Sequence, residues 1–340
     1  MADCSRTVAA PDFENSYAFG VNRHSSLGTP LTAWLHCAHM SITAEHRSFE
    51  IPHLAVFEEG AGGLTRLAIA TRRARAHIYL HGAHVTYFEP EGTGPVLFLS
   101  DSSLFLPDKA IRGGVPIIFP WFGARAGQSA APVHGFARTT PWEVEAISCG
   151  DDEAVDVTLR LRSNEETLKH WPHEFILRYR IAVSDTLTMS LELENVSDKP
   201  CVFEEALHTY LTVSDVRNIA ISGLADAEYI DKVDALARKR EGDAPIRIVG
   251  ETDRVYLHTQ SACDVNDPGA RRRLHVTKRG SDSTVVWNPW IVKAAALPDF
   301  GNDEWPRMLC IETANAADNT VTLAAGATHT MSATVACSAL

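Results

Sequence analysis

The chain has 340 residues, enough for one large or two ordinary domains, and 45% of them are hydrophobic, so a sizeable core can form. The formal net charge of −12 argues against nucleic acid or an anionic membrane as the main partner, and a phosphate-bearing ligand would need a local basic site. Seven scattered cysteines without a CxxC pair favour reduced thiols in a cytoplasmic protein. No apolar run reaches the length of a membrane span, and the N-terminus lacks a signal-peptide pattern.

The first 47 residues differ in character from the rest of the chain. They combine small polar residues with Pro11, Pro30 and several histidines, and an apolar patch lies between Leu31 and Met40. We expect residues 1–47 to be a partly irregular N-terminal extension and residues 48–340 to form the main domain.

From about residue 50 the apolar residues recur with a period of two. Short apolar runs at residues 67–70, 77–80, 85–88 and 96–99 are separated by Gly, Pro and charged residues. Such a series of short strands is typical of a β-sandwich.

Alternation is clearest in the centre of the chain. Apolar and polar residues alternate from Val155 to Arg162 and from Leu187 to Glu194, as in half-buried antiparallel strands. Phe175–Val183 and the C-terminal segments 321–323 and 328–335 add further strands.

The helical signal is weak. Only Asp234–Arg240 could form a short helix, and the charged stretch from Asp231 to Asp253 is expected to be a loop excursion. These patterns together predict an all-β fold made of one large antiparallel domain.

The stretch from Ala110 to Arg138 combines basic residues with glycine turns. Arg112 precedes a Gly-Gly pair that permits close backbone approach, and the stretch ends with His134-Gly-Phe-Ala-Arg138. Two arginines at a sheet rim could clamp a phosphate, and His134 could donate to a sugar oxygen. Alternatively, each arginine is a surface ion-pair partner and His134 is a turn residue.

Two further segments carry candidates for proton transfer. If Val202–Val213 is one strand, His208 lies in its middle, away from the more apolar face, and could be a general acid or base. Glu312 ends an apolar run, where partial burial would raise its pKa and make it a better base. The structural alternatives are a hydrogen-bonded strand histidine and a solvent-exposed glutamate at a strand end.

Several other residues have both a functional and a structural interpretation. Asp253 could accept hydrogen bonds from sugar hydroxyls or be a solvated turn charge, and Trp287 and Trp290 could stack on a sugar or fill the core. The two HxxH pairs, at residues 81–84 and 170–173, have no obvious third ligand, so we expect no metal. GxSxG, P-loop and GxGxxG motifs are absent from the sequence.

Taken in order, these motifs resemble the aldose 1-epimerase (mutarotase) superfamily, and within it the hexose-6-phosphate mutarotases, or glucose-6-phosphate 1-epimerases. The resemblance runs from about residue 50 to the C-terminus. It is carried by IRGGVP at 111–116, FP at 119–120, FG at 122–123, HGFAR at 134–138, ALHTYLTVSD at 206–215, YIDK at 229–232, ETDRVY at 251–256, VVWNPW at 285–290, DF at 299–300 and CIE at 310–312.

The resemblance implies a large antiparallel β-supersandwich of the galactose mutarotase type over residues 48–340. It implies His208 as general acid and Glu312 as general base, with Arg112 and Arg138 on the phosphate of the substrate. Asp253 would bind sugar hydroxyls. His134 takes the place of the superfamily's other active-site histidine.

The implied reaction interconverts the α and β anomers of a hexose 6-phosphate by ring opening and closure, without cofactor or metal. Val133 departs from the pattern, because relatives of this branch often carry Gln there. A mutarotase of a neutral aldose and a non-catalytic carbohydrate-binding β-sandwich are the alternatives. We expect a cytoplasmic monomer that binds neither nucleic acid nor membrane; the preferred hexose and the role of the extension stay open.

Overall fold

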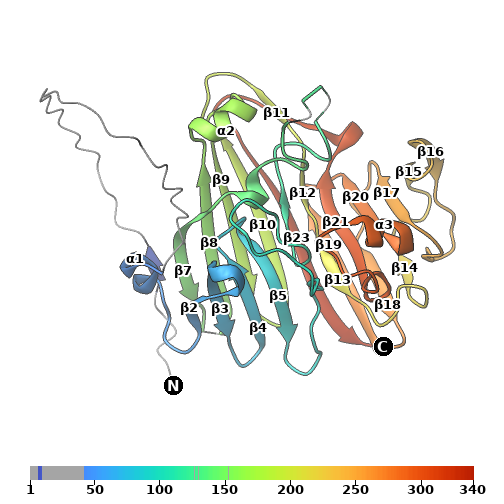
Figure 1. Cartoon of the computed structure of the whole chain (residues 1–340), viewed down its shortest axis with the longest axis horizontal. Coiled ribbons are helices and arrows are strands. Elements are labelled where there is room, and N and C mark those ends of the chain that lie inside the picture. Colours follow the sequence, from blue (N-terminus) through green and yellow to red (C-terminus); the bar gives the residue numbers. More distant parts are fainter. Residues whose placement is uncertain (1–6, 10–41, 126, 129, 152) are drawn as a thin grey trace, which may run out of the picture.

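The computed structural model describes residues 7–9, 42–125, 127–128, 130–151 and 153–340. The regular structure of this part of the chain is mainly antiparallel β-sheet, and the helices are short and peripheral (Figure 1). The all-β prediction is therefore confirmed. The predicted N-terminal extension lies mostly outside the described residues.

The largest sheet has nine strands and holds the central segments predicted from alternation. Its spatial order is β1 (Thr7–Ala9), β7 (Glu143–Cys149), β8 (Val155–Arg162), β9 (Phe175–Val183), β10 (Thr186–Asn195), β23 (Thr328–Ala339), β19 (Arg272–Arg279), β18 (Cys263–Asp267) and β14 (Ala220–Ser222).

A second sheet of eight strands contains most of the candidate site residues. Its order is β16 (Ala237–Arg240), β15 (Glu228–Asp231), β17 (Thr252–Tyr256), β20 (Ser283–Asn288), β21 (Met308–Asn315), β12 (Glu205–Leu207) and β6 (Ile117–Ile118), with β13 (Tyr210–Thr212) also paired to β21.

Two smaller sheets complete the domain. One contains β2 (Ala55–Glu59), β3 (Thr65–Ala70), β4 (Ala74–Tyr79) and β5 (His84–Pro90), and the other contains β11 (Cys201–Phe203) and β22 (Val321–Leu323). The helical segments are α1 (Ala44–Ser48), α2 (Glu165–His170), α3 (Trp290–Ala296) and the 3₁₀ turns Ala61–Gly63, Ala137–Thr139, Trp305–Arg307 and Ala317–Asn319.

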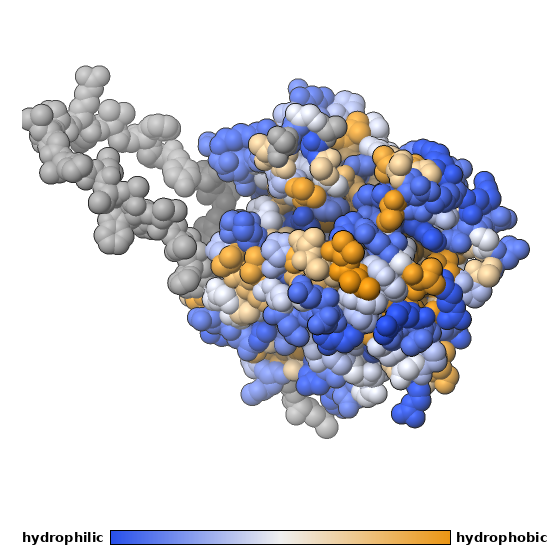
Figure 2. Space-filling view, turned by 45° about the vertical axis from the view of Figure 1, so that its right-hand side comes forward, coloured by the Kyte–Doolittle hydropathy of each residue, from blue (hydrophilic) through white to orange (hydrophobic). Residues whose placement is uncertain are grey.

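The core lies between the sheets and follows from the alternation in sequence. In β8 and β10 every second side chain is buried, and the apolar ones among them belong to one hydrophobic cluster that reaches all the sheets. The four-stranded sheet contacts the nine-stranded sheet through β4 and β9, and the eight-stranded sheet contacts it through β21 and β23. Each fully buried Leu or Val contributes roughly 1.5–3 kcal/mol. Hydrophilic side chains cover most of the face in Figure 2.

Two local predictions are wrong. Asp234–Arg240 does not form a helix, because Ala235 and Leu236 adopt positive φ and make a turn after which β16 pairs with β15. Val202–Val213 is not one strand: it is divided into β11, β12 and β13, and His208 lies in the interruption between the last two. Both faces are buried from Glu205 to Leu211, so the sequence pattern does not show the interruption.

The cysteine prediction is partly wrong. Cys201, Cys263, Cys310 and Cys337 are free thiols, whereas Cys149 is disulfide-bonded. No helix among the described residues is long and apolar enough to cross a membrane.

Candidate active site

His208 and Glu312 meet across the eight-stranded sheet. β12 and β13 pair with β21 in one register, Leu207 opposite Thr313 and Tyr210 opposite Cys310, so His208 faces Glu312. The distance from His208 Nε2 to Glu312 Oε1 is 3.2 Å, and both side chains are buried. Two groups that can exchange a proton are therefore in direct contact on the face of the sheet.

The strand interruption at His208 has a local cause. The His208 amide donates to the Pro116 carbonyl at 3.0 Å, and the Tyr210 amide donates to the Gly114 carbonyl at 2.9 Å. Gly114 has φ +60°, and a Cβ there would lie 2.2 Å from the Val85 carbonyl oxygen. The Gly-Gly pair after Arg112 thus lets this segment pass close to β5 and hold the backbone of the histidine.

Aromatic rings fix the imidazole from two sides. The Tyr210 ring stacks on His208 with centroids 4.7 Å apart and planes 13° apart, and Trp287 packs edge-on at 5.8 Å. Trp287 is thus part of the pocket wall as well as the core, whereas Trp290 packs on Trp305.

The protonation of the pair follows from burial and from nearby charge. Burial, followed by the charges of Arg138 and Arg112, lowers the pKa of His208 well below its usual value. Burial, followed by the charge of Asp253, raises the pKa of Glu312 well above its usual value. Burial therefore disfavours the charged form of both groups.

Arg112 has partners at both ends of its guanidinium. Nη2 pairs with Asp299 Oδ2 at 3.1 Å, and Nη1 donates to the Tyr210 hydroxyl at 3.1 Å. Its Nε and Asp299 Oδ1 are buried without a hydrogen-bond partner among the described residues. The predicted basic residue is in the pocket, but Asp299 offsets much of its charge.

Arg138, on the 3₁₀ turn Ala137–Thr139, has no carboxylate partner within the described part of the chain. Nη2 donates to the Val133 carbonyl at 2.8 Å, and Nε is buried without a partner. Burial and the neighbouring Arg112 lower its pKa to about 10. A half-buried cation without a counter-ion is costly, and an anionic ligand would supply the missing charge.

His134 is held as a neutral hydrogen-bond donor. Its amide donates to the Gly123 carbonyl at 2.7 Å, and its Nδ1 accepts from the Gly123 amide at 3.1 Å. Burial and Arg138 lower the pKa of His134 well below its usual value. The ring proton therefore lies on Nε2, which is free to donate to a ligand.

Asp253 is flanked by two lysines that the sequence analysis gave no role. Lys232 Nζ lies 3.3 Å and Lys293 Nζ 3.8 Å from Asp253 Oδ2, and Lys293 also pairs with Glu251. Lys232 additionally lies over the Phe122 ring at 5.3 Å. The YIDK motif that ends at Lys232 was a signal for this residue; Lys293 had none.

These residues line one pocket of about 440 Å³. The structure brings all six predicted site residues together in it. The lining is Arg112, Phe122, Gly123, Ala124, Val133, His134, Arg138, His208, Lys232, Asp253, Trp287, Lys293, Leu297 and Glu312. The size is sufficient for a small sugar derivative.

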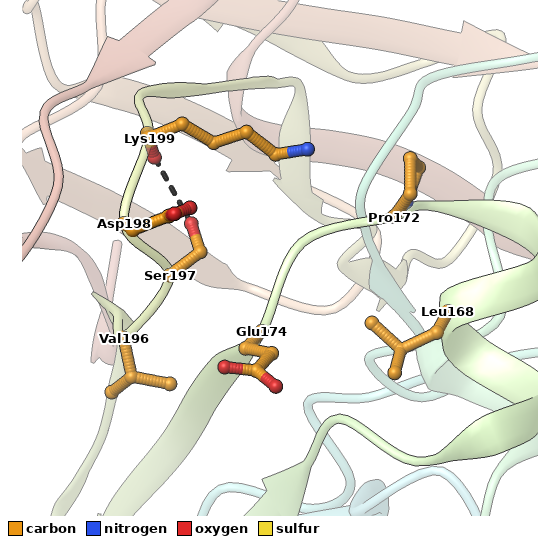
Figure 3. Close-up of a pocket in the computed structure, with 7 residues that line it drawn as sticks. All are labelled: Leu168, Pro172, Glu174, Val196, Ser197, Asp198 and Lys199. Carbon is orange, nitrogen blue, oxygen red and sulfur yellow. Dashed lines mark hydrogen bonds between the residues drawn. The ribbon is translucent and has the colours of Figure 1, made fainter.

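A second, more open cavity of about 640 Å³ lies between α2 and the turn after β10. Figure 3 shows Leu168 and Pro172 on one side and the turn 196–199 on the other, with Glu174 between them. It contains no acid–base pair in contact and none of the predicted site residues, so the smaller pocket is the candidate active site.

Metal-binding arrangements are poor among the described residues. His81 Nε2 and His84 Nε2 each bond a backbone carbonyl, of Lys109 and Gly113 respectively, so this HxxH pair braces the loop before and after Arg112. His208, Cys310 and Glu312 bring one ligand-type atom each within 4.8 Å of one another. The cationic arginines beside that cluster oppose a metal ion.

The profile of the family "Aldose 1-epimerase" matches residues 66–335. The chain belongs to the aldose 1-epimerase family.

Relatives within the family carry provisional names as glucose-6-phosphate 1-epimerases. One from Cenchrus ciliaris is 37% identical over 273 residues, which are 78% of this chain and 82% of that protein. One from Escherichia coli is 36% identical over 246 residues, 72% of this chain and 81% of that protein.

Solved structures agree on the fold. A provisionally named mutarotase from Salmonella typhimurium superposes with a TM-score of 0.79 at 30% identity, over 86% of this chain and 96% of that one. A galactose mutarotase-like protein from Clostridium acetobutylicum superposes with a TM-score of 0.65 at 14% identity, over 84% of this chain and 98% of that one. The predicted galactose mutarotase-like fold is thus confirmed.

Proposed function

We propose that the protein interconverts the α and β anomers of a hexose 6-phosphate, with glucose 6-phosphate as the first candidate. The observation that carries the proposal is the 3.2 Å contact of His208 and Glu312 in a pocket that also holds Arg138 without a counter-ion. The provisional names of the relatives support the same substrate class.

The chemistry needs two proton transfers at neighbouring oxygens. Glu312, as carboxylate, removes the proton of the C1 hydroxyl, and His208, as imidazolium, protonates the ring oxygen, so that the ring opens. Rotation about C1–C2 exposes the other face of the carbonyl. The ring then closes with the roles of Glu312 and His208 reversed.

The remaining pocket residues bind and orient the sugar. Arg138 and Arg112 hold the phosphate, because phosphate oxygens fit a guanidinium fork. Asp253 accepts hydrogen bonds from hydroxyls, and His134 donates to a sugar oxygen. Holding the substrate at two ends places C1 beside the acid–base pair.

Two-dimensional exchange NMR with glucose 6-phosphate beside glucose tests the proposal. We expect His208→Ala and Glu312→Gln each to lower the enzymatic rate by roughly 10²- to 10⁴-fold. Circular dichroism should show an intact fold in both variants. Unchanged rates in both variants contradict the site assignment, and faster exchange of glucose than of the phosphate favours the neutral-aldose alternative.

The cytoplasmic location and the monomeric state stay predictions. The first rests on the scattered cysteines of the chain, and size-exclusion chromatography with light scattering measures the second.

A further inference from the structure

Tyr210 contacts two functional groups of the pocket without lining the pocket itself. Its side chain is buried, and it is absent from the residues that line the pocket, so it can act on a ligand only through its neighbours. Its ring stacks on the imidazole of His208, and its hydroxyl accepts a hydrogen bond from Arg112. One buried side chain thus contacts both the general acid and a phosphate-binding residue of the proposed reaction.

The ring of Tyr210 fixes the orientation of the imidazole. The two rings are nearly parallel, with planes 13° apart, and Trp287 meets both of them edge-on. A histidine that transfers protons at one ring nitrogen is usually oriented by a hydrogen bond at the other. Nδ1 of His208 has no such partner among the described residues. The orientation of the imidazole therefore depends on the aromatic packing.

The hydroxyl of Tyr210 holds the guanidinium of Arg112. Nη1 donates to this hydroxyl and Nη2 pairs with Asp299 Oδ2, both at 3.1 Å. Two fixed partners keep a long side chain in one conformation, so less conformational entropy is lost when an anion binds. A phenylalanine would give the same stacking on His208, and a buried hydroxyl is costly without a partner. The hydroxyl is therefore accounted for by Arg112 rather than by packing.

The backbone of Tyr210 is itself held on three sides. Its amide donates to the Gly114 carbonyl at 2.9 Å, and its carbonyl accepts from the Phe98 amide at 3.0 Å. The residue is also paired with Cys310 in β21, the strand that carries Glu312. The ring therefore extends from a backbone whose position relative to Glu312 is fixed by the sheet.

We propose that Tyr210 is a positioning residue with two separable roles: its ring sets the plane of the His208 imidazole, and its hydroxyl sets the guanidinium of Arg112 for the phosphate. The first role serves every sugar that reacts in the pocket, whereas the second serves only phosphorylated sugars. The inference rests on the proposed function and adds a residue that joins proton transfer to phosphate binding.

Two substitutions of Tyr210 separate these roles. Tyr210→Phe removes the hydroxyl and keeps the ring; since Asp299 still holds the guanidinium, we expect KM for glucose 6-phosphate to rise by roughly 3- to 30-fold. The kcat for glucose 6-phosphate and the exchange of neutral glucose should not change. Tyr210→Leu removes the ring as well and should lower kcat for both sugars by roughly 10- to 100-fold, because a catalytic group is then misplaced.

Tyr256→Phe is the matched control for the loss of a buried hydroxyl. Tyr256 lies on β17 of the same sheet and outside the pocket lining, and its hydroxyl donates to Glu241 and lies 3.4 Å from Nη1 of Arg254. Its removal can lower the free energy of unfolding in urea, but KM and kcat should equal those of the unmodified protein. A purely structural role of Tyr210 would give the same pattern in Tyr210→Phe.

A double-variant cycle tests whether the hydroxyl acts through Arg112. In the Arg112→Met background, Tyr210→Phe should have no further effect on KM for glucose 6-phosphate. Arg180→Met is the matched background, because Arg180 lies on β9 in the nine-stranded sheet and is 65% exposed beside Asp156. There the effect of Tyr210→Phe should persist in full.

Exchange NMR over a range of substrate concentrations gives kcat and KM, and circular dichroism reports folding. The inference is overturned if Tyr210→Phe leaves KM unchanged, if it slows both sugars equally, or if its effect is the same in the Arg112→Met background. A Tyr210→Leu variant with unchanged kcat overturns the role of the ring. Should that variant not fold, Tyr210→Met, which keeps more of the volume, takes its place.

Isothermal titration with inorganic phosphate supplies a readout independent of turnover. Tyr210→Phe should weaken phosphate binding by the same roughly 3- to 30-fold, and Tyr256→Phe should not weaken it. Failure of the unmodified protein to exchange glucose 6-phosphate overturns the proposed function, while this titration still decides whether the hydroxyl acts on an anion site. Equal phosphate binding by the unmodified protein and Tyr210→Phe, or none by either, overturns the inference.

Discussion

Replacing Arg138 with Met should stabilise the ligand-free protein and damage its activity at the same time. The guanidinium is a cation without an acidic partner among the described residues, and burial together with Arg112 lowers its pKa from the usual arginine value to about 10. Methionine keeps much of the aliphatic volume of the side chain and removes the charge.

The magnitude follows from the shift in pKa. At pH 7 the arginine is charged in both the folded and the unfolded protein, so the full cost of the lowered pKa weighs on the folded state. This cost disappears only as the pH rises through about 10 and beyond the ordinary pKa of arginine. The shift corresponds to roughly 3 kcal/mol, and screening at the pocket mouth reduces it. We expect a gain of about 1–2 kcal/mol in the free energy of unfolding.

The effect on function should have the opposite sign and depend on the substrate. Charge-assisted hydrogen bonds contribute roughly 1.5–3 kcal/mol, which corresponds to a roughly 10- to 150-fold loss in kcat/KM for glucose 6-phosphate. Exchange of neutral glucose should change by far less.

Urea unfolding and exchange NMR measure the two effects on the same preparations. Phosphate should raise the unfolding midpoint of the unmodified protein more than that of Arg138→Met, and Arg180→Met should resemble the unmodified protein in both assays. A variant that is less stable, or that loses glucose and glucose 6-phosphate turnover equally, refutes the assignment of Arg138 as an uncompensated phosphate ligand.

Three further predictions concern other parts of the domain. Gly114→Ala should lower the free energy of unfolding in urea more than Gly92→Ala does. Both glycines have positive φ, but only at Gly114 does backbone lie within 3 Å of the added Cβ. Equal losses of stability would contradict the close approach of the backbone at Gly114. His329→Gln should destabilise the protein more at pH 5.5 than at pH 9, because hydrogen bonding to buried Glu205 raises the pKa of His329. The stabilisation from this imidazolium is present below the ordinary histidine pKa near 6.5 and is lost as the pH rises through the raised pKa. A loss of stability that is independent of pH would disprove this. Val133→Gln should lower KM for glucose 6-phosphate by roughly 2- to 10-fold through one added hydrogen bond. The stability should not change, because Val133 is 50% exposed. An unchanged KM would show that the side chain does not reach the substrate.

The strands with clear alternation were predictable because their signal is local. In β8 and β10 each residue faces the core or the solvent according to its own position in the pleat, so six to eight residues suffice to recognise the strand. β16 was mistaken for a helix because its pairing with β15 depends on a turn at Ala235 and Leu236, residues with no special turn chemistry.

The six site residues were found through the order of the motifs, and Lys293 was missed because α3 carries no such motif. The sequence does not show that Asp299 offsets Arg112 while Arg138 stays uncompensated, because ion pairing depends on side chains that approach only in the folded chain.

The amino-acid sequence by itself determined the all-β architecture and the chemical types available for catalysis. Only the tertiary structure decided that His208 faces Glu312, because their contact depends on the register between β12, β13 and β21, which joins residues about a hundred positions apart. Register is set by pairing across the whole sheet rather than by any local pattern. Burial of that contact then shifts the pKa of His208 downward and that of Glu312 upward.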